Sequence, residues 1–271
     1  MDHGGGCVCR HTCQGGVKQG MYIALAAVAT LYVGICLAMF IFRRSLLYYP
    51  QPRVVTAPDS TLALHVPGSE LVVTVRPRAG PKAIIYFGGN GEDVSSNLES
   101  FSRAFPDHAL FLLHYRGYGG STGHPSEQAI NGDAVALFKN VYAEHTEITL
   151  IGRSLGSGVA IRLASESPAS RLILVTPFDS IEEIAAAEYP YVPVKLLLLD
   201  RYESWKYAPG IAIPTTIIAA GNDEVIPHAS TEKLFVRFHP GVAAMRVIEG
   251  VGHNDIGATS EYIQAIQAAL Q

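Results

Sequence analysis

Hydrophobic residues follow two different patterns along this chain. From Met21 to Phe42 they form one continuous run with no charged residue, and Arg43 and Arg44 end it. A helix of about 20 apolar residues crosses the hydrocarbon core of a bilayer. The run therefore predicts a transmembrane anchor over residues 21–42. Later in the chain the pattern is interrupted, and short apolar runs alternate with stretches of helical character.

A cleaved signal peptide is the alternative to an anchor. The run is longer than an ordinary signal core, and no small-x-small cleavage site precedes the arginines, so a single-pass anchor is favoured. Arg10 and Lys18 precede the run, whereas Arg43, Arg44 and Arg53 follow it. Because positive charge collects on the cytoplasmic side, this near balance slightly favours a cytoplasmic position for the rest of the chain.

Residues 1–20 are rich in glycine and cysteine and predict a disordered tail. Cys7, Cys9 and Cys13 in this segment could hold a metal ion or carry an acyl group. A further alternative is that Met21 is the natural start of the chain. None of the four cysteines lies after residue 60, so disulfides do not staple the part that follows.

The interrupted pattern predicts one α/β domain over residues 61–271, after a proline-containing linker strap over residues 43–60. Apolar runs of this kind are typical of parallel strands buried on both faces, and their alternation with helices predicts a doubly wound, mostly parallel sheet. The expected strands are 61–66, 71–76, 83–87, 110–115, 148–151, 172–176, 215–220 and 245–248. The expected helices are 94–105, 126–142, 155–165, 229–238 and 255–270.

Residues 181–208 do not fit the alternation. They lie between two predicted strands, are too long for a simple crossover helix, and contain Pro190, Pro193 and several aromatic rings. We expect them to form a small cap over the ends of the strands.

Ser154 is the first candidate for chemistry. It lies in the sequence Gly-Arg-Ser-Leu-Gly (152–156), between a predicted buried strand and a predicted helix. This context is typical of a nucleophile elbow, in which glycines allow a sharp turn to pass close to its neighbours. The pattern predicts Ser154 as a nucleophile.

A serine nucleophile needs a histidine base and a carboxylate that orients the base. Asp223 and His253 each come directly after a late predicted strand, in the order serine, acid, histidine, and parallel strands would bring them to the same sheet edge. We therefore predict Asp223 as the acid and His253 as the base. Asp179, which also follows a strand, is the main alternative acid, and Glu224 is a weaker one.

The tetrahedral intermediate of acyl transfer needs donors for its oxyanion. The backbone N–H of Leu155, directly after the serine, can supply one. A second is expected from the loop Phe-Gly-Gly-Asn-Gly (87–91), with Asn90 as the donor. A phosphate-binding loop is the alternative for these glycines, but their spacing is wrong and no Gly-Lys-Ser/Thr follows.

These motifs, together with the segment HYRGYGGS (114–121), resemble the α/β-hydrolase superfamily over nearly all of the chain after the anchor. The sequence LLYYP (46–50) after a membrane helix resembles single-anchor hydrolases related to eukaryotic protein depalmitoylases. One departure concerns the oxyanion loop, because the family usually has a histidine where this chain has Gly88.

The resemblance implies a serine esterase or thioesterase that works without metal or organic cofactor. Its substrates would be acyl esters or thioesters, carried by a lipid or an acylated protein at a bilayer, with Tyr118, Tyr191 and Leu197 as candidate substrate-binding residues. A serine peptidase and a non-catalytic binding protein remain alternatives. The net charge of −4 and the absence of basic clusters indicate no nucleic-acid partner.

Overall fold

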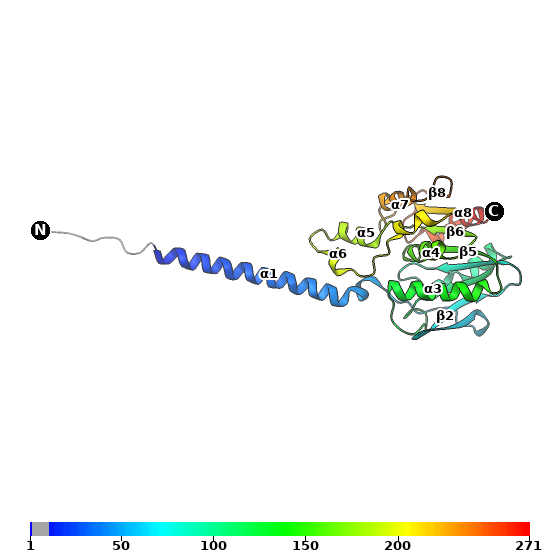
Figure 1. The fold of residues 1–271 in the computed structure, drawn as a ribbon, viewed down its shortest axis with the longest axis horizontal. Coiled ribbons are helices and arrows are strands. Elements are labelled where there is room, and N and C mark those ends of the chain that lie inside the picture. The colour runs from blue at the N-terminus through cyan, green and yellow to red at the C-terminus, as the bar shows by residue number, and fades with distance from the viewer. Residues whose placement is uncertain (2–10) are drawn as a thin grey trace. The chain divides into compact units, whose positions relative to one another are not determined.

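The computed structural model describes Met1 and residues 11–271, with side chains from Lys18 onward. It divides into two units, Met1–Arg43 and Arg44–Gln271, of which the second contains the sheet (Figure 1). Cys7, Cys9 and the side chain of Cys13, named above as candidate metal ligands or acylation sites, lie outside the described residues.

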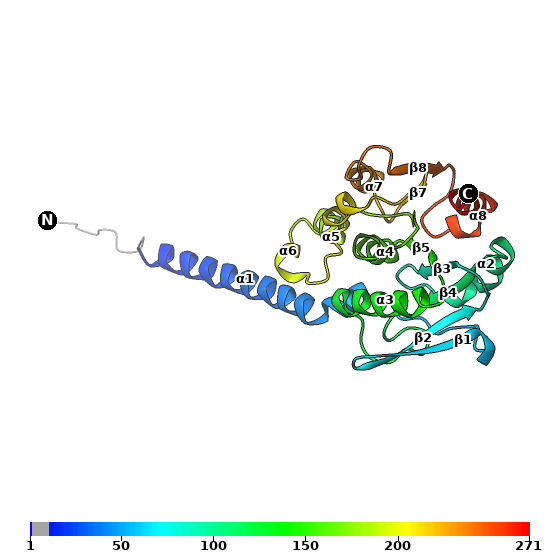
Figure 2. The same cartoon turned by 45° about the vertical axis from the view of Figure 1, so that its right-hand side comes forward.

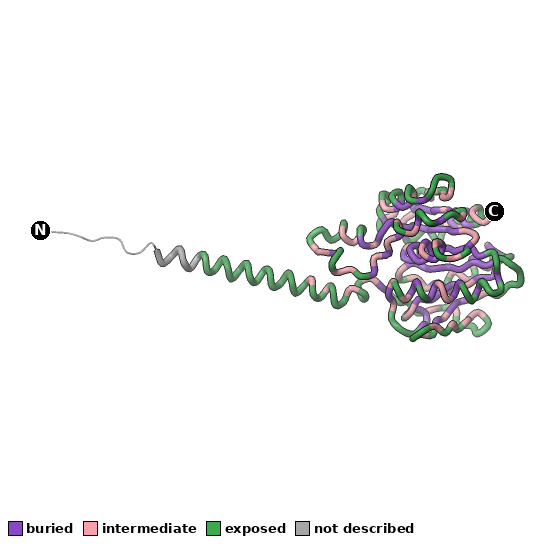
Figure 3. The backbone as a smooth tube through the Cα atoms, viewed as in Figure 1, coloured by how far each residue is buried: buried purple, intermediate pink, exposed green. Residues whose placement is uncertain are grey.

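The first unit is built on helix α1 (His11–Leu47), whose last residues belong to the second unit. By length and composition, its segment Lys18–Leu47 could cross a membrane. Most residues along it are exposed, as the colour of the tube in Figure 3 shows. Residues 11–20, predicted as part of a disordered tail, are helical in the structure. Once a helix has formed, each further residue adds a hydrogen bond at little entropic cost, so a long apolar helix can extend into polar flanks.

The second unit begins at Arg44 rather than at residue 61, because the segment predicted as a linker strap is bound to the domain. The Tyr48 side chain is buried, with 3% exposure. The backbone N–H of Val54 donates to the Asp93 carboxylate at 2.8 Å, and the carbonyl of Gln51 accepts from Gly119 at 2.8 Å. Polar groups of the strap thus find partners on the domain.

The sheet has eight strands in the order β1-β2-β4-β3-β5-β6-β7-β8. The pairs β1·β2 and β2·β4 are antiparallel, and all other pairs are parallel. This confirms the doubly wound, mostly parallel sheet, and strand ends differ from those predicted by at most two residues. The strands are β1 (Thr61–Val66), β2 (Ser69–Arg76), β3 (Lys82–Phe87), β4 (Ala109–Leu113), β5 (Glu147–Arg153), β6 (Arg171–Val175), β7 (Thr215–Ala220) and β8 (Ala243–Ile248).

Helices cover both faces of the sheet because successive side chains of each strand point to opposite sides. In β3, Ile85 packs into a core cluster with α3 (Glu127–Tyr142), α4 (Leu155–Glu166) and α7 (His228–Phe235). Its neighbour Ile84 packs into a second cluster with α2 (Leu98–Ala104) and α8 (Ser260–Ala269). Figure 2 shows α3 and α4 on one side of the strands and α2 and α8 on the other.

The predicted cap contains α5 (Ile181–Glu188) and α6 (Val194–Leu197), between β6 and β7. Ser180 caps the first helix, because its side chain accepts a hydrogen bond from the Glu183 N–H. Several large apolar side chains of this segment face solvent. Their exposed fractions are 52% for Tyr189, 87% for Tyr191, 76% for Leu196 and 52% for Leu199.

Candidate active site

Ser154 lies on the turn from β5 to α4. Its backbone has φ 49° and ψ −118°, a combination that is uncommon for a residue with a side chain. The Ser154 N–H donates to the carbonyl of Val175 at 2.9 Å, so the turn is held to the neighbouring strand β6. Strained backbone of this kind is typical of functional sites.

Two glycines make the turn possible. A Cβ atom on Gly152 would lie 2.4 Å from the carbonyl oxygen of Gly156, and one on Gly156 would lie 2.1 Å from that of Phe87. Backbone atoms cannot yield at such distances, so both positions require glycine. The Gly-x-Ser-x-Gly spacing is therefore dictated by the close packing of β5 on α4 at Gly152 and of α4 on the end of β3 at Gly156.

The structure brings Ser154, His253 and Asp223 together. Nε2 of His253 lies 2.9 Å from Oγ of Ser154, and Nδ1 lies 2.9 Å and 3.0 Å from the two Asp223 carboxylate oxygens. Asp223 follows β7 and His253 follows β8. The carboxyl ends of these parallel strands thus position a base beside the serine and an acceptor behind the base.

Asp223 is built to remain charged. Burial works against its ionised form, but hydrogen bonds from His253 and from the N–H groups of Ile226 and Val225, at 2.7 Å and 2.9 Å, outweigh it and lower the pKa of Asp223. The His253 and Asp223 side chains are each only 6% exposed. A charged Asp223 fixes the imidazole tautomer that leaves Nε2 free to accept the Ser154 proton.

The two alternative acids, Glu224 and Asp179, do not hydrogen-bond the imidazole ring of His253 in the structure. Glu224 accepts a hydrogen bond from the backbone N–H of His253 at 3.1 Å, so it braces the histidine loop instead of the imidazole ring. Asp179 is buried, with 3% exposure, and its Oδ1 has no hydrogen-bond partner among the described residues. Burial and the nearby Glu183 raise the pKa of Asp179.

Two backbone groups are available for an oxyanion beside Ser154. Leu155 is the first residue of α4, so its N–H has no partner within the helix. Asn90 lies in the loop after β3 and lines the same cavity as Ser154, and its backbone N–H has no acceptor in the part of the chain that the structure describes. The geometry therefore leaves both predicted donors available for an oxyanion.

The side chain of Asn90, unlike its backbone N–H, is held by hydrogen bonds within the described part of the chain. Its Oδ1 accepts hydrogen bonds from the Tyr118 hydroxyl at 2.9 Å and from the Tyr49 N–H at 3.1 Å, and its amide nitrogen donates to the Leu47 carbonyl. Tyr118 also interacts with Tyr49 through its hydroxyl, which accepts from the Tyr49 N–H at 2.9 Å. Tyr118, predicted to bind substrate, thus lies buried behind the oxyanion loop and supports it.

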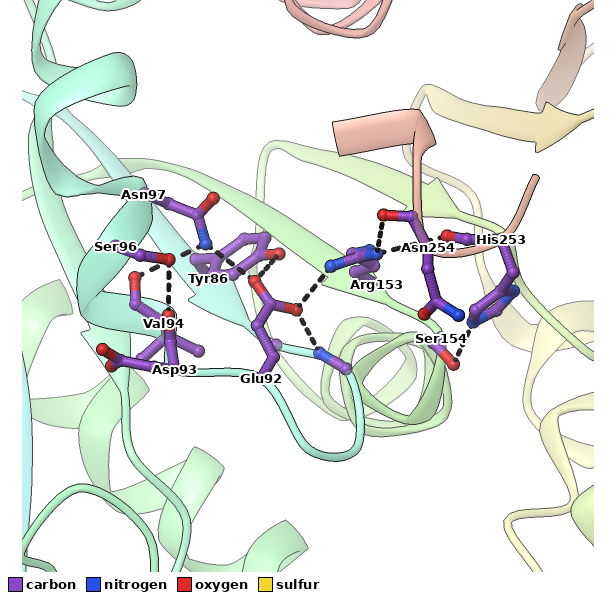
Figure 4. A network of polar contacts seen from close by, with 12 residues as sticks. Tyr86, Glu92, Asp93, Val94, Ser96, Asn97, Arg153, Ser154, His253 and Asn254 are labelled. Atoms are coloured by element: carbon purple, nitrogen blue, oxygen red, sulfur yellow. Dashed lines mark hydrogen bonds and ion pairs between the residues drawn. The ribbon is translucent and has the colours of Figure 1, made fainter. Parts of the chain in front are cut away.

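A buried ion pair next to the site was not predicted from the sequence. Glu92 accepts hydrogen bonds from Tyr86 and Asn97 on Oε1, both at 2.7 Å, and from Gly89 N–H on Oε2 at 2.7 Å (Figure 4). Arg153 donates to the same Oε2 at 3.2 Å. Burial works against the Arg153 charge, but Glu92 outweighs it and raises the pKa of Arg153. The sequence contained one sign of this ion pair, the charged residue Arg153 at the first variable position of the Gly-x-Ser-x-Gly motif.

The cavity at Ser154 has a volume of about 400 Å³, and both polar and apolar groups line it. Neither of the cap residues predicted to bind substrate lines it, because Tyr191 faces solvent and Leu197 is half-buried in α6. A larger cavity of about 550 Å³, lined in part by Arg78, Phe111 and Glu144, contains none of the three residues of the serine site. The residues that line the Ser154 cavity are Tyr49, Gly89, Asn90, Gly91, Glu92, Arg153, Ser154, Val225, His253 and Asn254.

Comparison with known proteins places the chain among the α/β hydrolases, as the elbow and the order of the strands indicate. The Pyrococcus furiosus esterase Pf2001 superimposes with a TM-score of 0.62 over 82% of this chain and 96% of that one, at 16% identity. This likeness shows the fold. The nematode α/β hydrolase domain-containing protein aho-3 is 28% identical over 194 residues, covering 69% of this chain and 57% of that protein.

Within this superfamily, the chain belongs to the same family as the uncharacterized protein Rv2307c of Mycobacterium tuberculosis. The two are 33% identical over 253 residues, which cover 85% of this chain and 87% of that protein. No family model matches the chain.

Proposed function

We propose that this α/β hydrolase is a membrane-anchored serine hydrolase that cleaves carboxylic ester or thioester bonds. The observation that carries the proposal is the hydrogen-bonded series Ser154 Oγ, His253 Nε2, His253 Nδ1 and Asp223, with donor–acceptor distances of 2.9 to 3.0 Å. The apolar helix Lys18–Leu47 supports the anchor, and the charges around it slightly favour a cytoplasmic catalytic domain. An acylated protein or a lipid is the proposed source of the acyl group.

Each half of the reaction moves one proton through His253. In acylation, Nε2 takes the proton from Ser154 as Oγ attacks the carbonyl carbon, and the N–H groups of Leu155 and Asn90 stabilise the oxyanion. Nε2 then returns the proton to the departing alcohol or thiol. In deacylation, water attacks the acyl-serine ester by the same route and the carboxylic acid leaves.

A fluorophosphonate probe tests the first step, since it labels only an activated serine. We expect the full chain in detergent to label and the Ser154→Ala variant to remain unlabelled. Folded protein that fails to label would point to a non-catalytic binding protein. Turnover should then be compared on ester, thioester and peptide substrates with the same acyl group, because faster cleavage of the amide would favour a peptidase.

A further inference from the structure

The ion pair of Glu92 and Arg153 contacts the backbone of the oxyanion loop and of the histidine loop, and Arg153 itself belongs to the nucleophile elbow. Glu92 accepts from the N–H of Gly89, the residue before Asn90. Arg153 directly precedes Ser154, and its second terminal nitrogen lies 3.2 Å from the carbonyl oxygen of His253. It also lies 3.5 Å from the carbonyl oxygen of Asn254. Figure 4 shows the pair between these loops.

We propose that Glu92 and Arg153 are positioning residues, which hold the oxyanion donor and the histidine in register with the nucleophile. The inference rests on the proposed serine hydrolase activity and adds two residues to its machinery. Both residues line the cavity at Ser154, and their proposed role is carried by the contacts that they make with backbone groups of the loops.

The structure gives a reason for this chain to use a carboxylate here. A Cβ atom at Gly88, the residue before Gly89, would lie 2.3 Å from Cγ1 of Val94. A side chain at position 88 therefore cannot brace the loop without a shift of Val94. Glu92 reaches the loop from its other end and fixes the Gly89 N–H at 2.7 Å.

Each partner needs the other for electrostatic reasons. A carboxylate beside the oxyanion donor would repel the negative charge that develops in the transition state, and it would do so strongly in a site shielded from water. The guanidinium of Arg153 neutralises it, with side-chain exposures of only 16% for Arg153 and 11% for Glu92. The pair can therefore brace the loops without opposing the reaction.

The hydrogen bonds of Glu92 also explain why an amide cannot replace it. Oε1 accepts from two donors, Tyr86 and Asn97, and Oε2 accepts from two more, Gly89 and Arg153. Glutamine at this position turns one of these oxygens into a donor. Toward Gly89 and Arg153 it would face two groups that can only donate, and toward Tyr86 and Asn97 both partners would have to turn round to accept. Glu92→Gln should therefore weaken either the hydrogen bond from the Gly89 N–H, which holds the oxyanion loop, or the hydrogen bonds from Tyr86 and Asn97, which hold the Glu92 side chain.

The test measures kcat and KM on a soluble short-chain ester, with the full chain in detergent and active sites counted with a fluorophosphonate. Arg153→Met leaves the carboxylate unpaired and should lower kcat by about 10²- to 10³-fold, the scale of a lost oxyanion donor, while KM changes less than about threefold. Glu92→Gln should lower kcat by about 10-fold or more. The double variant should be faster than Arg153→Met, because it removes the unpaired charge.

Arg153→Lys serves as the conservative variant. Lysine restores the charge but not the fork that reaches Glu92 and the His253 carbonyl together, so its kcat should fall between those of wild type and Arg153→Met. It also keeps the test decisive if Arg153→Met does not fold, because a kcat equal to that of wild type in the lysine variant would contradict the need for both contacts.

Asp133→Asn is the matched control for the loss of a buried ion pair. Asp133 binds Arg116 through two hydrogen bonds of 2.7 and 2.8 Å, and its side chain is only 3% exposed. The control should lower the melting temperature but leave kcat per labelled site within about twofold, as expected for a change outside the reacting loops. An unchanged kcat in Arg153→Met, or a double variant slower than Arg153→Met, would overturn the inference. Wild-type protein without Ser154-dependent turnover would instead overturn the proposed function.

Discussion

The side-chain oxygen of Asn90 accepts a hydrogen bond from the backbone N–H of Tyr49, 3.1 Å away and 41 residues earlier in the chain. The Tyr118 hydroxyl donates to the same oxygen at 2.9 Å. The amide of Asn90 thus joins the segment that follows α1 to the loop that carries the predicted oxyanion donor. Its backbone and its side chain have separate tasks.

Asn90→Ala tests the role of the side chain, which holds the loop to Tyr49 and Tyr118. The substitution keeps the backbone N–H but removes the side-chain partner of the Tyr49 and Tyr118 groups, which should lower the free energy of unfolding by about 1 to 3 kcal/mol. Turnover should fall by roughly tenfold as the loop loosens, far less than the ~10²- to 10³-fold loss expected for Asn90→Pro, which removes the donor itself. Denaturant unfolding and ester kinetics measure the two effects. Asn140→Ala, an exposed asparagine on α3, should change neither, and equal losses in both alanine variants would contradict the assignment.

The sequence predicted the parts of the site that depend on local geometry. Ser154, Asp223 and His253 each follow a parallel strand, and parallel strands that end at one edge bring their following loops together whatever the details of packing. The same logic predicted the doubly wound sheet, because strand and helix periodicities are local signals.

Features that depend on side-chain packing across the fold could not be predicted in this way. The Glu92–Arg153 pair joins residues 61 positions apart, and nothing in either local sequence shows that they meet. Tyr118 lies in a motif close to the site, but its side chain turns toward Asn90 and away from the cavity. The cap looked apolar enough for an acyl pocket, whereas Tyr191 and Leu196 face outward.

Ser154→Ala and His253→Ala should each lower turnover by roughly 10⁴- to 10⁶-fold, and the double variant should be little worse, because the residues of a triad act as a unit. Unfolding transitions of the three proteins should nearly coincide with that of wild type. Steady-state kinetics with active-site counting measure the losses. Losses that multiply in the double variant would mean that the two side chains act independently.

Asp223→Asn should lower turnover by about 10⁴-fold, because the amide favours the wrong imidazole tautomer. Asp179→Asn should change it by less than about threefold, since Asp179 forms no hydrogen bond with His253 in the structure. The same ester assay compares the two variants, which differ from wild type by the same chemical change. The opposite ranking would make Asp179 the catalytic acid.

Asp179→Asn should have its main effect on stability. Burial, and then the charge of Glu183, raise the pKa of Asp179 above its ordinary value of 3.8, so the folded protein disfavours the ionised form. The folded state therefore loses stability, relative to the unfolded state, as the pH rises from 3.8 through the raised pKa. The asparagine variant escapes this loss and should be more stable than wild type at pH 7.

The pH dependence distinguishes this cause from better packing. Below pH 3.8 the aspartate is protonated in both states, so the gain should disappear there. Urea unfolding of wild type and Asp179→Asn at several pH values measures the difference. A gain of equal size at every pH would show that the carboxylate charge is not its source.

The last prediction concerns the exposed apolar side chains of the cap. Arg44, the first residue of the second unit, forms an ion pair at 3.4 Å with Asp200, which follows α6 in the cap segment. Leu196 and Leu199 are 76% and 52% exposed. Placing such side chains in the bilayer interface gains up to about 1.5 to 3 kcal/mol each, which would hold the cap at the membrane surface.

Replacing Leu196 and Leu199 together by Asp should therefore lower the hydrolysis of a long-chain acyl ester presented in vesicles by about tenfold, the factor that corresponds to about 1.4 kcal/mol. Hydrolysis of a soluble acetyl ester by the same vesicle-bound protein should stay within twofold of wild type, because neither leucine lines the cavity at Ser154. Val236→Asp is the matched control, since Val236 is 74% exposed but follows α7, outside the cap. If the control slows the long-chain reaction as much as the leucine variant does, the added charge itself is responsible. A leucine variant with unchanged long-chain hydrolysis would separate the cap from the membrane surface altogether.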